Sequence, residues 1–214
     1  MRLLTILTTS VILGLVYAQD VSLTQVRQAF QAARIPTDAS VVFNPSVLLE
    51  VAFPQATGPD VRVKAGVQLP RNKTAIPPTF SIVVNGPGRR PRGEFVVAMV
   101  DLDAPTPQTP TSAQIRHFLG GNFTPLRDRG GLALLSNSTP AVSGFLQPTP
   151  PAGSDPHRYV FLLFQQSKAF NGQTFVGPTT SVAKFNISLF AQEVGLGNPL
   201  GGTFIRVGPD SPAA

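Results

Sequence analysis

The sequence predicts a mainly β protein, and three observations support this fold class. Proline and glycine together occupy 41 of the 214 positions, 22 Pro and 19 Gly, which disfavours long helices. Hydrophobic residues make up 42% and charged residues 13% of the chain, so material for a core is plentiful and a disordered polyelectrolyte is excluded. The apolar residues gather in short β-branched and aromatic runs separated by turn residues, which is the pattern of strands.

Residues 1–18 have the pattern of a secretory signal peptide. Arg2 supplies the positive charge, the run 3–16 is apolar apart from Thr, Ser and Gly, and small residues precede a cleavage position after Ala18. A membrane anchor is the alternative, but the run is shorter than the ~20 apolar residues that a spanning helix needs. We therefore expect a secreted, extracellular protein with no transmembrane segment, in which residues 19–214 form a single domain.

Cysteine content and glycosylation motifs agree with export. The chain has 0 Cys, which excludes disulfides and thiol chemistry, and a domain of roughly 200 residues buries enough surface to fold without them. Four Asn-X-Ser/Thr sequons begin at Asn72, Asn122, Asn137 and Asn186. We expect a glycan on at least one of them. Asn72 and Asn137 lie in turn-rich segments and are favoured, whereas Asn186 is disfavoured because it is also a candidate helix cap.

Two helices are predicted, one near each end of the domain. Ser22 is a capping residue ahead of apolar positions that follow helical spacing from Val26, and Pro36 is expected to end this helix. Asn186 caps the second helix and Gly195 closes it.

The strands are predicted from short apolar runs bounded by Pro, Gly and Asn. They lie at residues 47–53, 61–69, 80–84, 94–103, 115–122, 159–165 and 204–207. Residues 124–157 are expected to be mostly irregular, because the proline-rich run 148–156 cannot pair in a sheet. No repeat divides the chain.

The formal net charge is +6, so anionic partners are considered, but the excess is too small to identify one. Arg89, Arg90 and Arg92 form a basic loop tip whose expected role is solubility. The tip lacks interleaved aromatic residues, and export also argues against a nucleic-acid partner.

Residues able to carry chemistry are scarce. Beyond the leader, the chain has two histidines, His117 and His157, and one tyrosine, Tyr159. Strand alternation places His157 and Tyr159 on one face and Arg158 on the other, and the same alternation places Asp101 and Asp103 together. These groups fall at strand ends, where a polar pocket can gather them.

Two separated motifs resemble the signatures of the phosphatidylethanolamine-binding protein family. The first is the run 95–105, Phe-Val-Val-Ala-Met-Val-Asp-Leu-Asp-Ala-Pro, followed by His117. The second is His157-Arg158-Tyr159 followed by a hydrophobic strand. The resemblance extends over most of residues 19–214. It implies a central antiparallel sheet with a smaller sheet and flanking helices, and a small pocket for phosphate-like groups.

The resemblance also implies which residues form the pocket. Asp101, His117, His157 and Tyr159 would bind the ligand, and the pocket rim would be formed by Asp103, Pro105 and Asp155. The chain departs from the family pattern at five positions: Leu102, Thr106, Gln114, Ile115 and Asp155. Asp155, in place of a glycine, adds a negative charge near the mouth, so anion affinity is weakened or the ligand is changed.

Structural roles compete with these assignments. Asp101 and Asp103 fit the capping of a turn, and Arg158, facing away from the pocket, fits a salt bridge beneath the sheet. No short metal-ligand spacing, hydrolase serine motif or nucleotide loop is present, so we expect neither a metal nor a cofactor and can assign no nucleophile.

Three functions follow, in order of preference. The first is a secreted, non-enzymatic binding protein for a small anionic or phosphorylated group, such as a phospholipid head group. The second, implied by some relatives, is a protein inhibitor of a serine carboxypeptidase or other protease, for which residues 19–36 are the segment of interest. The third is an esterase-like enzyme, which is least favoured because it lacks an assigned nucleophile. Catalytic silence is therefore expected.

Overall fold

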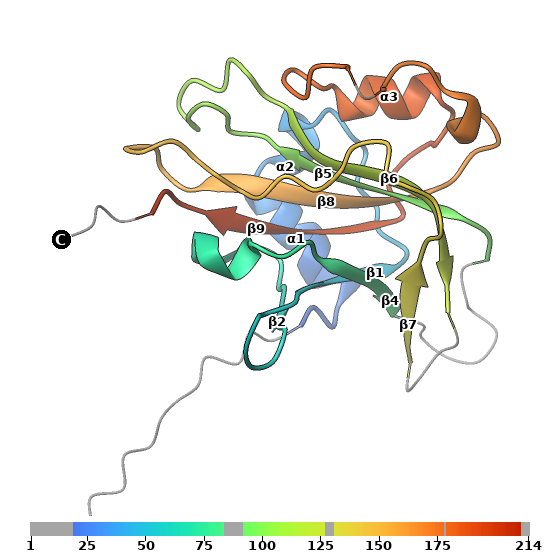
Figure 1. Ribbon diagram of the computed structural model, residues 1–214, viewed down its shortest axis with the longest axis horizontal. Helices are drawn as coiled ribbons and strands as arrows, with labels where there is room; N and C mark the ends of the chain where they lie inside the picture. Colours follow the sequence, from blue (N-terminus) through green and yellow to red (C-terminus); the bar gives the residue numbers. More distant parts are fainter. Residues whose placement is uncertain (1–18, 84–91, 127–130, 178, 211–214) are drawn as a thin grey trace, which may run out of the picture.

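The computed structural model describes residues 19–83, 92–126, 131–177 and 179–210. The basic tip of the loop 85–93 lies almost wholly outside these residues. In the described part, nine strands form one strongly curled sheet in the order β2-β1-β4-β7-β6-β5-β8-β9-β3 (Figure 1). The strands are β1 (Leu48–Phe53), β2 (Val61–Arg62), β3 (Val67–Gln68), β4 (Thr79–Val83), β5 (Phe95–Asp101), β6 (Ile115–Pro125), β7 (Leu132–Ser136), β8 (His157–Gln165) and β9 (Gly201–Val207).

Few and short helices accompany the sheet. They are α1 (Leu23–Ala32), α2 (Ile35–Asp38), α3 (Ile187–Glu193) and two 3-10 turns, η1 (Arg71–Thr74) and η2 (Phe170–Gly172). The mainly β prediction is confirmed. The predicted smaller sheet, β2-β1-β4-β7, is continuous with the central strands because β6 pairs with β7 at its far end.

Strand alternation divides the interior into two cores. On one face of β5 and β8, residues such as Val96 and Leu162 pack against α1, α2 and α3. On the other face, residues such as Val97 and Phe161 pack against β1 and β4, which fold over them. Both central strands are thus buried on both sides, which explains why they are apolar throughout.

Helix α1 lies very close to the sheet. Phe30 is fully buried, stacks on Phe43 with 3.9 Å between ring centroids, and meets Phe204 edge-on at 5.5 Å. A Cβ on Gly202 would lie 3.1 Å from the Phe30 ring and 2.6 Å from the carbonyl oxygen of Phe161. A glycine is therefore needed here for the helix to reach the strand.

The first helix ends differently from the prediction. Ser22 caps α1 as expected, with its hydroxyl accepting from the Gln25 N–H. However, Pro36 does not end this helix. The helix stops at Ala32, and Arg34 adopts a left-handed conformation with φ 57°. Pro36 is the second residue of α2, in the first helical turn, where the backbone N–H groups have no partner within the helix and the missing N–H of proline costs nothing.

One strand prediction requires correction, and one strand was not predicted. The run 61–69 is split, because Gly66 with φ +88° turns the chain between β2, which pairs with β1, and β3, which pairs in parallel with β9. The segment 124–157 contains β7, whose alternating burial places Ala133 and Leu135 against the second core. The helix from Asn186 to Gly195 is confirmed, with the Asn186 side chain accepting from the Leu189 N–H.

Candidate functional site

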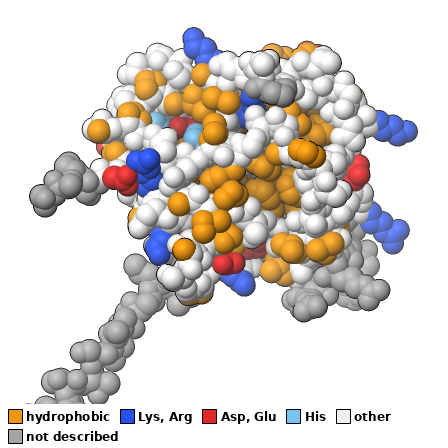
Figure 2. Space-filling view, in the orientation of Figure 1, with side chains coloured by type: hydrophobic (Ala, Val, Ile, Leu, Met, Phe, Trp, Pro, Cys, Tyr) orange, Lys and Arg blue, Asp and Glu red, His pale blue; other side chains and the backbone are white. Residues whose placement is uncertain are grey.

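The two histidines and Tyr159 line one cavity at an end of the central strands. The cavity has a volume of about 420 Å³ and is walled by the strand ends and by the segment 146–151. Asp101, His117, His157 and Tyr159 all line it. Figure 2 shows histidine and acidic atoms together in a hollow bordered by hydrophobic side chains.

Strand register places these four groups. Asp101 on β5 pairs directly with Tyr159 on the neighbouring β8, and His157 lies two residues earlier on the same face of β8. His117 comes from β6 on the other side of β5. The Tyr159 ring lies 5.0 Å from the His117 ring, edge to face, and 6.2 Å from the His157 ring in a nearly parallel orientation.

His157 and Asp101 form a buried pair. The His157 Nδ1 lies 2.9 Å from Asp101 Oδ2, and the two residues are only 1% and 3% exposed. The other carboxylate oxygen, Oδ1, accepts from the Asp103 N–H at 2.8 Å. This second bond fixes the carboxylate, so the imidazole it faces is held in one orientation.

His117 is oriented by a backbone carbonyl. Its Nδ1 lies 2.8 Å from the Leu146 oxygen, so Nδ1 carries a proton and donates to that carbonyl. In the neutral ring Nε2 then has a lone pair, and only protonation makes it a donor. Burial lowers the pKa of His117, an effect that the Leu146 carbonyl and the nearby Asp101 only partly oppose. The neutral form of His117 therefore persists to a lower pH than in an ordinary histidine.

Tyr159 remains a hydroxyl group at any physiological pH. Burial raises the pKa of its phenol well above the usual value, and the neighbouring Asp101 carboxylate raises it further. The residue is 1% exposed. It therefore contributes a neutral hydroxyl to the cavity wall.

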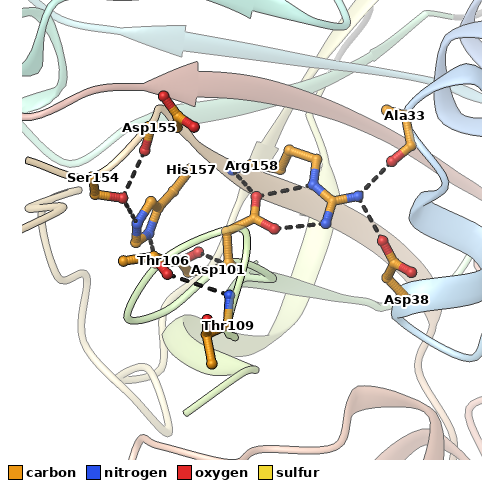
Figure 3. A network of polar contacts seen from close by, with 10 residues as sticks. Ala33, Asp38, Asp101, Thr106, Thr109, Ser154, Asp155, His157 and Arg158 are labelled. Atoms are coloured by element: carbon orange, nitrogen blue, oxygen red, sulfur yellow. Dashed lines mark hydrogen bonds and ion pairs between the residues drawn. The ribbon is translucent and has the colours of Figure 1, made fainter. Parts of the chain in front are cut away.

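Ser154 joins this site and was not predicted from the sequence. Its hydroxyl oxygen lies 2.8 Å from His157 Nε2, the nitrogen that would otherwise be open to a ligand, and 2.8 Å from the Asp155 carbonyl oxygen (Figure 3). The only sequence signal is its position three residues before His157 in a Gly-Ser-Asp-Pro turn. No hydrolase serine motif marks this residue, which is why no nucleophile was assigned from the sequence.

Asp103 does not shape the pocket rim, contrary to the prediction. Its carboxylate accepts from the Arg158 backbone N–H at 2.7 Å, from Nε at 2.9 Å and from Nη2 at 2.6 Å (Figure 3). Alternation fails here because β5 ends at Asp101 and the following turn rotates the next acidic side chain to the helical side of the sheet.

Arg158 has the structural position expected of it. Its Nη1 also contacts the Ala33 carbonyl and Asp38 Oδ2, so the residue ties β8 to both N-terminal helices (Figure 3). Burial lowers the pKa of the guanidinium, but the hydrogen bonds with Asp103 and Asp38 outweigh that effect and raise it above its usual value.

The other two predicted rim residues lie outside the cavity wall. Pro105 is exposed, and the wall at this point is formed by the preceding Ala104. Asp155 is also exposed, and its carboxylate accepts from the Gln108 side-chain amide. The negative charge of Asp155 is therefore next to Ser154 but does not point into the cavity lining.

The four sequons differ in their surroundings. Asn72 is exposed in η1. Asn122 has φ 58° and its amide nitrogen donates to another side chain, while Asn137 Nδ2 donates to the Gly121 carbonyl at 2.8 Å. Asn186 is exposed and uses its Oδ1 as the cap of α3. Asn72 is thus the sequon least engaged by the fold.

Within the described ranges, no group of three or more His, Asp or Glu side chains is arranged to hold a metal ion. In the same residues, no helix combines the length and apolarity that crossing a bilayer requires.

The fold and the cavity define a mainly β protein with a small pocket at the strand ends, where two histidines, a tyrosine and an aspartate meet apolar side chains. Residues 59–205, more than half of the chain, match the family model described as phosphatidylethanolamine-binding protein. The chain belongs to this family.

Two curated relatives that the chain matches are distant from it. The chain is 28% identical over 150 residues to a 26 kDa secreted antigen of Toxocara canis, covering 69% of this chain and 52% of the antigen. It is 27% identical over 163 residues to the carboxypeptidase Y inhibitor of Saccharomyces cerevisiae, covering 62% and 68% of the two chains. The chain thus spans about half the length of the secreted antigen.

Solved structures support the fold. A carboxypeptidase Y inhibitor, crystallised with its cognate proteinase, superimposes with a TM-score of 0.73 at 22% identity, covering 87% of this chain and 96% of that one. The phosphatidylethanolamine-binding protein of Plasmodium vivax gives a TM-score of 0.62 at 15% identity, with coverages of 86% and 97%.

Proposed function

We propose that this chain is a secreted binding protein whose cavity takes up a small phosphorylated or otherwise anionic group, such as a phospholipid head group, and releases it unchanged. The observation that carries the proposal is the convergence of two imidazoles and a tyrosine hydroxyl on one cavity of about 420 Å³. Secretion is supported by the leader-like residues 1–18 and by the similarity to a secreted antigen.

His117 is the residue that decides whether an anion is held. His157 Nε2 is occupied by Ser154 and its Nδ1 by Asp101, so His117 Nε2 is the ring nitrogen left for a ligand. A neutral His117 presents a lone pair that repels an anion, whereas the protonated ring presents a charged N–H donor.

Binding should therefore depend on pH. An anion stabilises the protonated form of His117 and raises its pKa, so affinity increases as pH falls from the pKa of the bound state to that of the free state. Because burial lowers the free-state pKa, the increase continues below the ordinary value of 6.5. Below the free-state pKa the affinity levels off.

Calorimetric titration with phosphoethanolamine at pH 5 and pH 7.5 tests this proposal. We expect tighter binding at pH 5, and a loss of about 10- to 100-fold at that pH in His117→Ala, the range expected for a charge-assisted hydrogen bond. Arg206→Ala is the matched control, because it removes an exposed cation on β9 away from the cavity. Equal affinity at both pH values, or equal affinity in wild type and His117→Ala, contradicts the proposal.

Inhibition of a serine carboxypeptidase is the second candidate, supported by the similarity to the yeast inhibitor and by the shape of the N-terminal segment. Val21 is 79% exposed between the buried Asp20 and the capping Ser22, so it projects from a fixed point. Val21→Asp should weaken inhibition of a serine carboxypeptidase, whereas Val42→Asp, at another residue that is 59% exposed, should not. Absence of inhibition by the unmodified chain removes this candidate.

A further inference from the structure

Ser154, His157 and Asp101 form a continuous chain of hydrogen bonds. The Ser154 hydroxyl lies 2.8 Å from His157 Nε2, and His157 Nδ1 lies 2.9 Å from Asp101 Oδ2 (Figure 3). The sequence order and spacing match no hydrolase motif. The roles nevertheless match those of an activated serine: a hydroxyl next to a base, and a base oriented by a carboxylate.

The positions of the protons follow from the acceptors. Asp101 also accepts a hydrogen bond from the Asp103 N–H, so its carboxylate is positioned to accept a second one from His157 Nδ1–H. The neutral ring then has a lone pair on Nε2. The Ser154 hydroxyl donates to the Asp155 carbonyl oxygen at 2.8 Å, and turned toward Nε2, at the same distance, it donates to that lone pair instead.

Burial differs sharply along this chain of bonds. His157 is 1% and Asp101 3% exposed, so water does not compete for the imidazole and carboxylate. Ser154 is half-buried and follows Gly153, which turns the chain with φ +80°. It is not part of the cavity wall, but its hydroxyl contacts His157, which is. The serine is therefore partly open to solvent beside the cavity, while the base remains protected.

The cavity wall selects the class of reagent. Much of the wall is apolar, including Ile115, Leu146, Pro150 and Pro151. Asp101 contributes a negative charge, and His117 is favoured in its neutral form. At neutral pH these surroundings favour an uncharged ligand with an apolar group, such as a small carboxylic ester.

We propose that Ser154 is a nucleophile that accepts the acyl group of small uncharged esters. Its oxygen forms a bond to the ester carbonyl carbon while His157 Nε2 takes the hydroxyl proton. The carbon–oxygen bond to the alcohol then breaks, and the alcohol leaves with that proton. Water releases the acid from the acyl-serine by the same steps, with His157 again the base. This reaction goes beyond the proposed binding of an anion.

Intact-protein and peptide mass spectrometry after exposure to p-nitrophenyl butyrate at pH 7.5 tests the proposal. We expect a butyryl adduct on the peptide that contains Ser154 and none in Ser154→Ala. Ser138→Ala is the control, because Ser138 is an exposed serine away from the site. No adduct in the unmodified protein, or an adduct that persists in Ser154→Ala, overturns the proposal.

A second pair of variants tests the activation itself. The chain has 0 Cys, so Ser154→Cys and Ser138→Cys each create a single thiol. Beside His157, the thiol at position 154 should react with iodoacetamide at pH 6.5 at least about tenfold faster than the thiol at position 138, because an adjacent imidazole favours the thiolate. Equal rates, with both variants folded by circular dichroism, overturn the proposal.

These results are separable from the proposed function. Phosphoethanolamine binding without acylation removes the role of Ser154 and leaves the anion site. Acylation without phosphoethanolamine binding removes the anion site and leaves the nucleophile.

Discussion

Glu50 should make this protein less stable as the pH rises. The residue lies on β1, is 6% exposed, and its Oε1 has no hydrogen-bond partner in the described part of the chain. Burial is the main reason that the pKa of this carboxyl rises from 4.5 to about 7. The hydrogen bond with Gln19 and the charge of Arg62 lower the pKa, whereas the charge of Asp20 raises it. The folded protein thus keeps a proton that the unfolded chain loses.

The sign and size follow from proton linkage. Between pH 4.5 and about 7 the unfolded state binds fewer protons than the folded state, so the free energy of unfolding decreases as pH rises through this window. At about 1.4 kcal/mol per pH unit, the difference between the two pKa values amounts to about 3 kcal/mol. The loss is complete above pH 7 and absent below pH 4.5.

Glu50→Gln removes this charge with little change in shape. We expect the free energy of unfolding to rise by about 2 kcal/mol at pH 8, with little change at pH 4, because the amide never ionises. The assay is urea denaturation at several pH values. It uses chains that extend beyond Gln19 at the N-terminal end, so that Gln19 carries no ammonium group near Glu50. Glu193→Gln, at an exposed position on α3, is the control and should leave the pH profile unchanged. Parallel profiles for wild type and Glu50→Gln would refute the reasoning.

Three further predictions address the scaffold and the processing of the chain. Arg158→Ala should lower the free energy of unfolding by about 3 kcal/mol, because it removes the guanidinium that pairs with the buried Asp103 carboxylate. Asp38→Ala, at the more exposed partner of Arg158, should lower it by less than about 1 kcal/mol. Equal losses of stability in urea denaturation would contradict this reasoning. In protein secreted from a eukaryotic cell, Asn72→Gln should remove one N-glycan from the intact mass, and an unchanged mass would show that this sequon is unused. Cleavage after residue 18 creates an ammonium group on Gln19, whose side chain reaches Glu50. This positive charge favours the ionised carboxylate, so the cleaved chain should lose less stability between pH 5 and 7 than an extended one. Identical slopes of unfolding free energy against pH would count against this proximity.

The central strands were predictable because they obey a simple repeat. β5 and β8 are long apolar runs in which alternate residues face two different cores, so His157, Arg158 and Tyr159 are assigned to their faces by counting. β7 was missed because it is short and lies inside a segment dominated by proline and glycine. It pairs with β6, which directly precedes it, only at the end of that strand. Its other partner, β4, comes from a distant part of the sequence, and no local pattern records that pairing.

The site was predictable only where its residues belong to strands. Asp101 and Tyr159 meet because their strands are paired in register. Asp103 lies beyond the end of β5, where alternation no longer applies, and it faces Arg158 instead of the cavity. Ser154 lies in a turn whose path depends on tertiary contacts. Periodicity holds no information about such a turn.

Hydrogen bonding to the rings changes what the two histidines can do. The sequence supports treating both as donors to an anion, since either imidazole can donate when protonated. In the structure, His117 Nδ1–H donates a hydrogen bond to the Leu146 carbonyl, and the Ser154 hydroxyl is the hydrogen-bond partner of His157 Nε2. The proposed anion binding therefore uses Nε2 of His117, whereas the proposed acceptance of the serine proton uses Nε2 of His157. The nitrogen partners, more than the residue types, thus determine what each histidine can do.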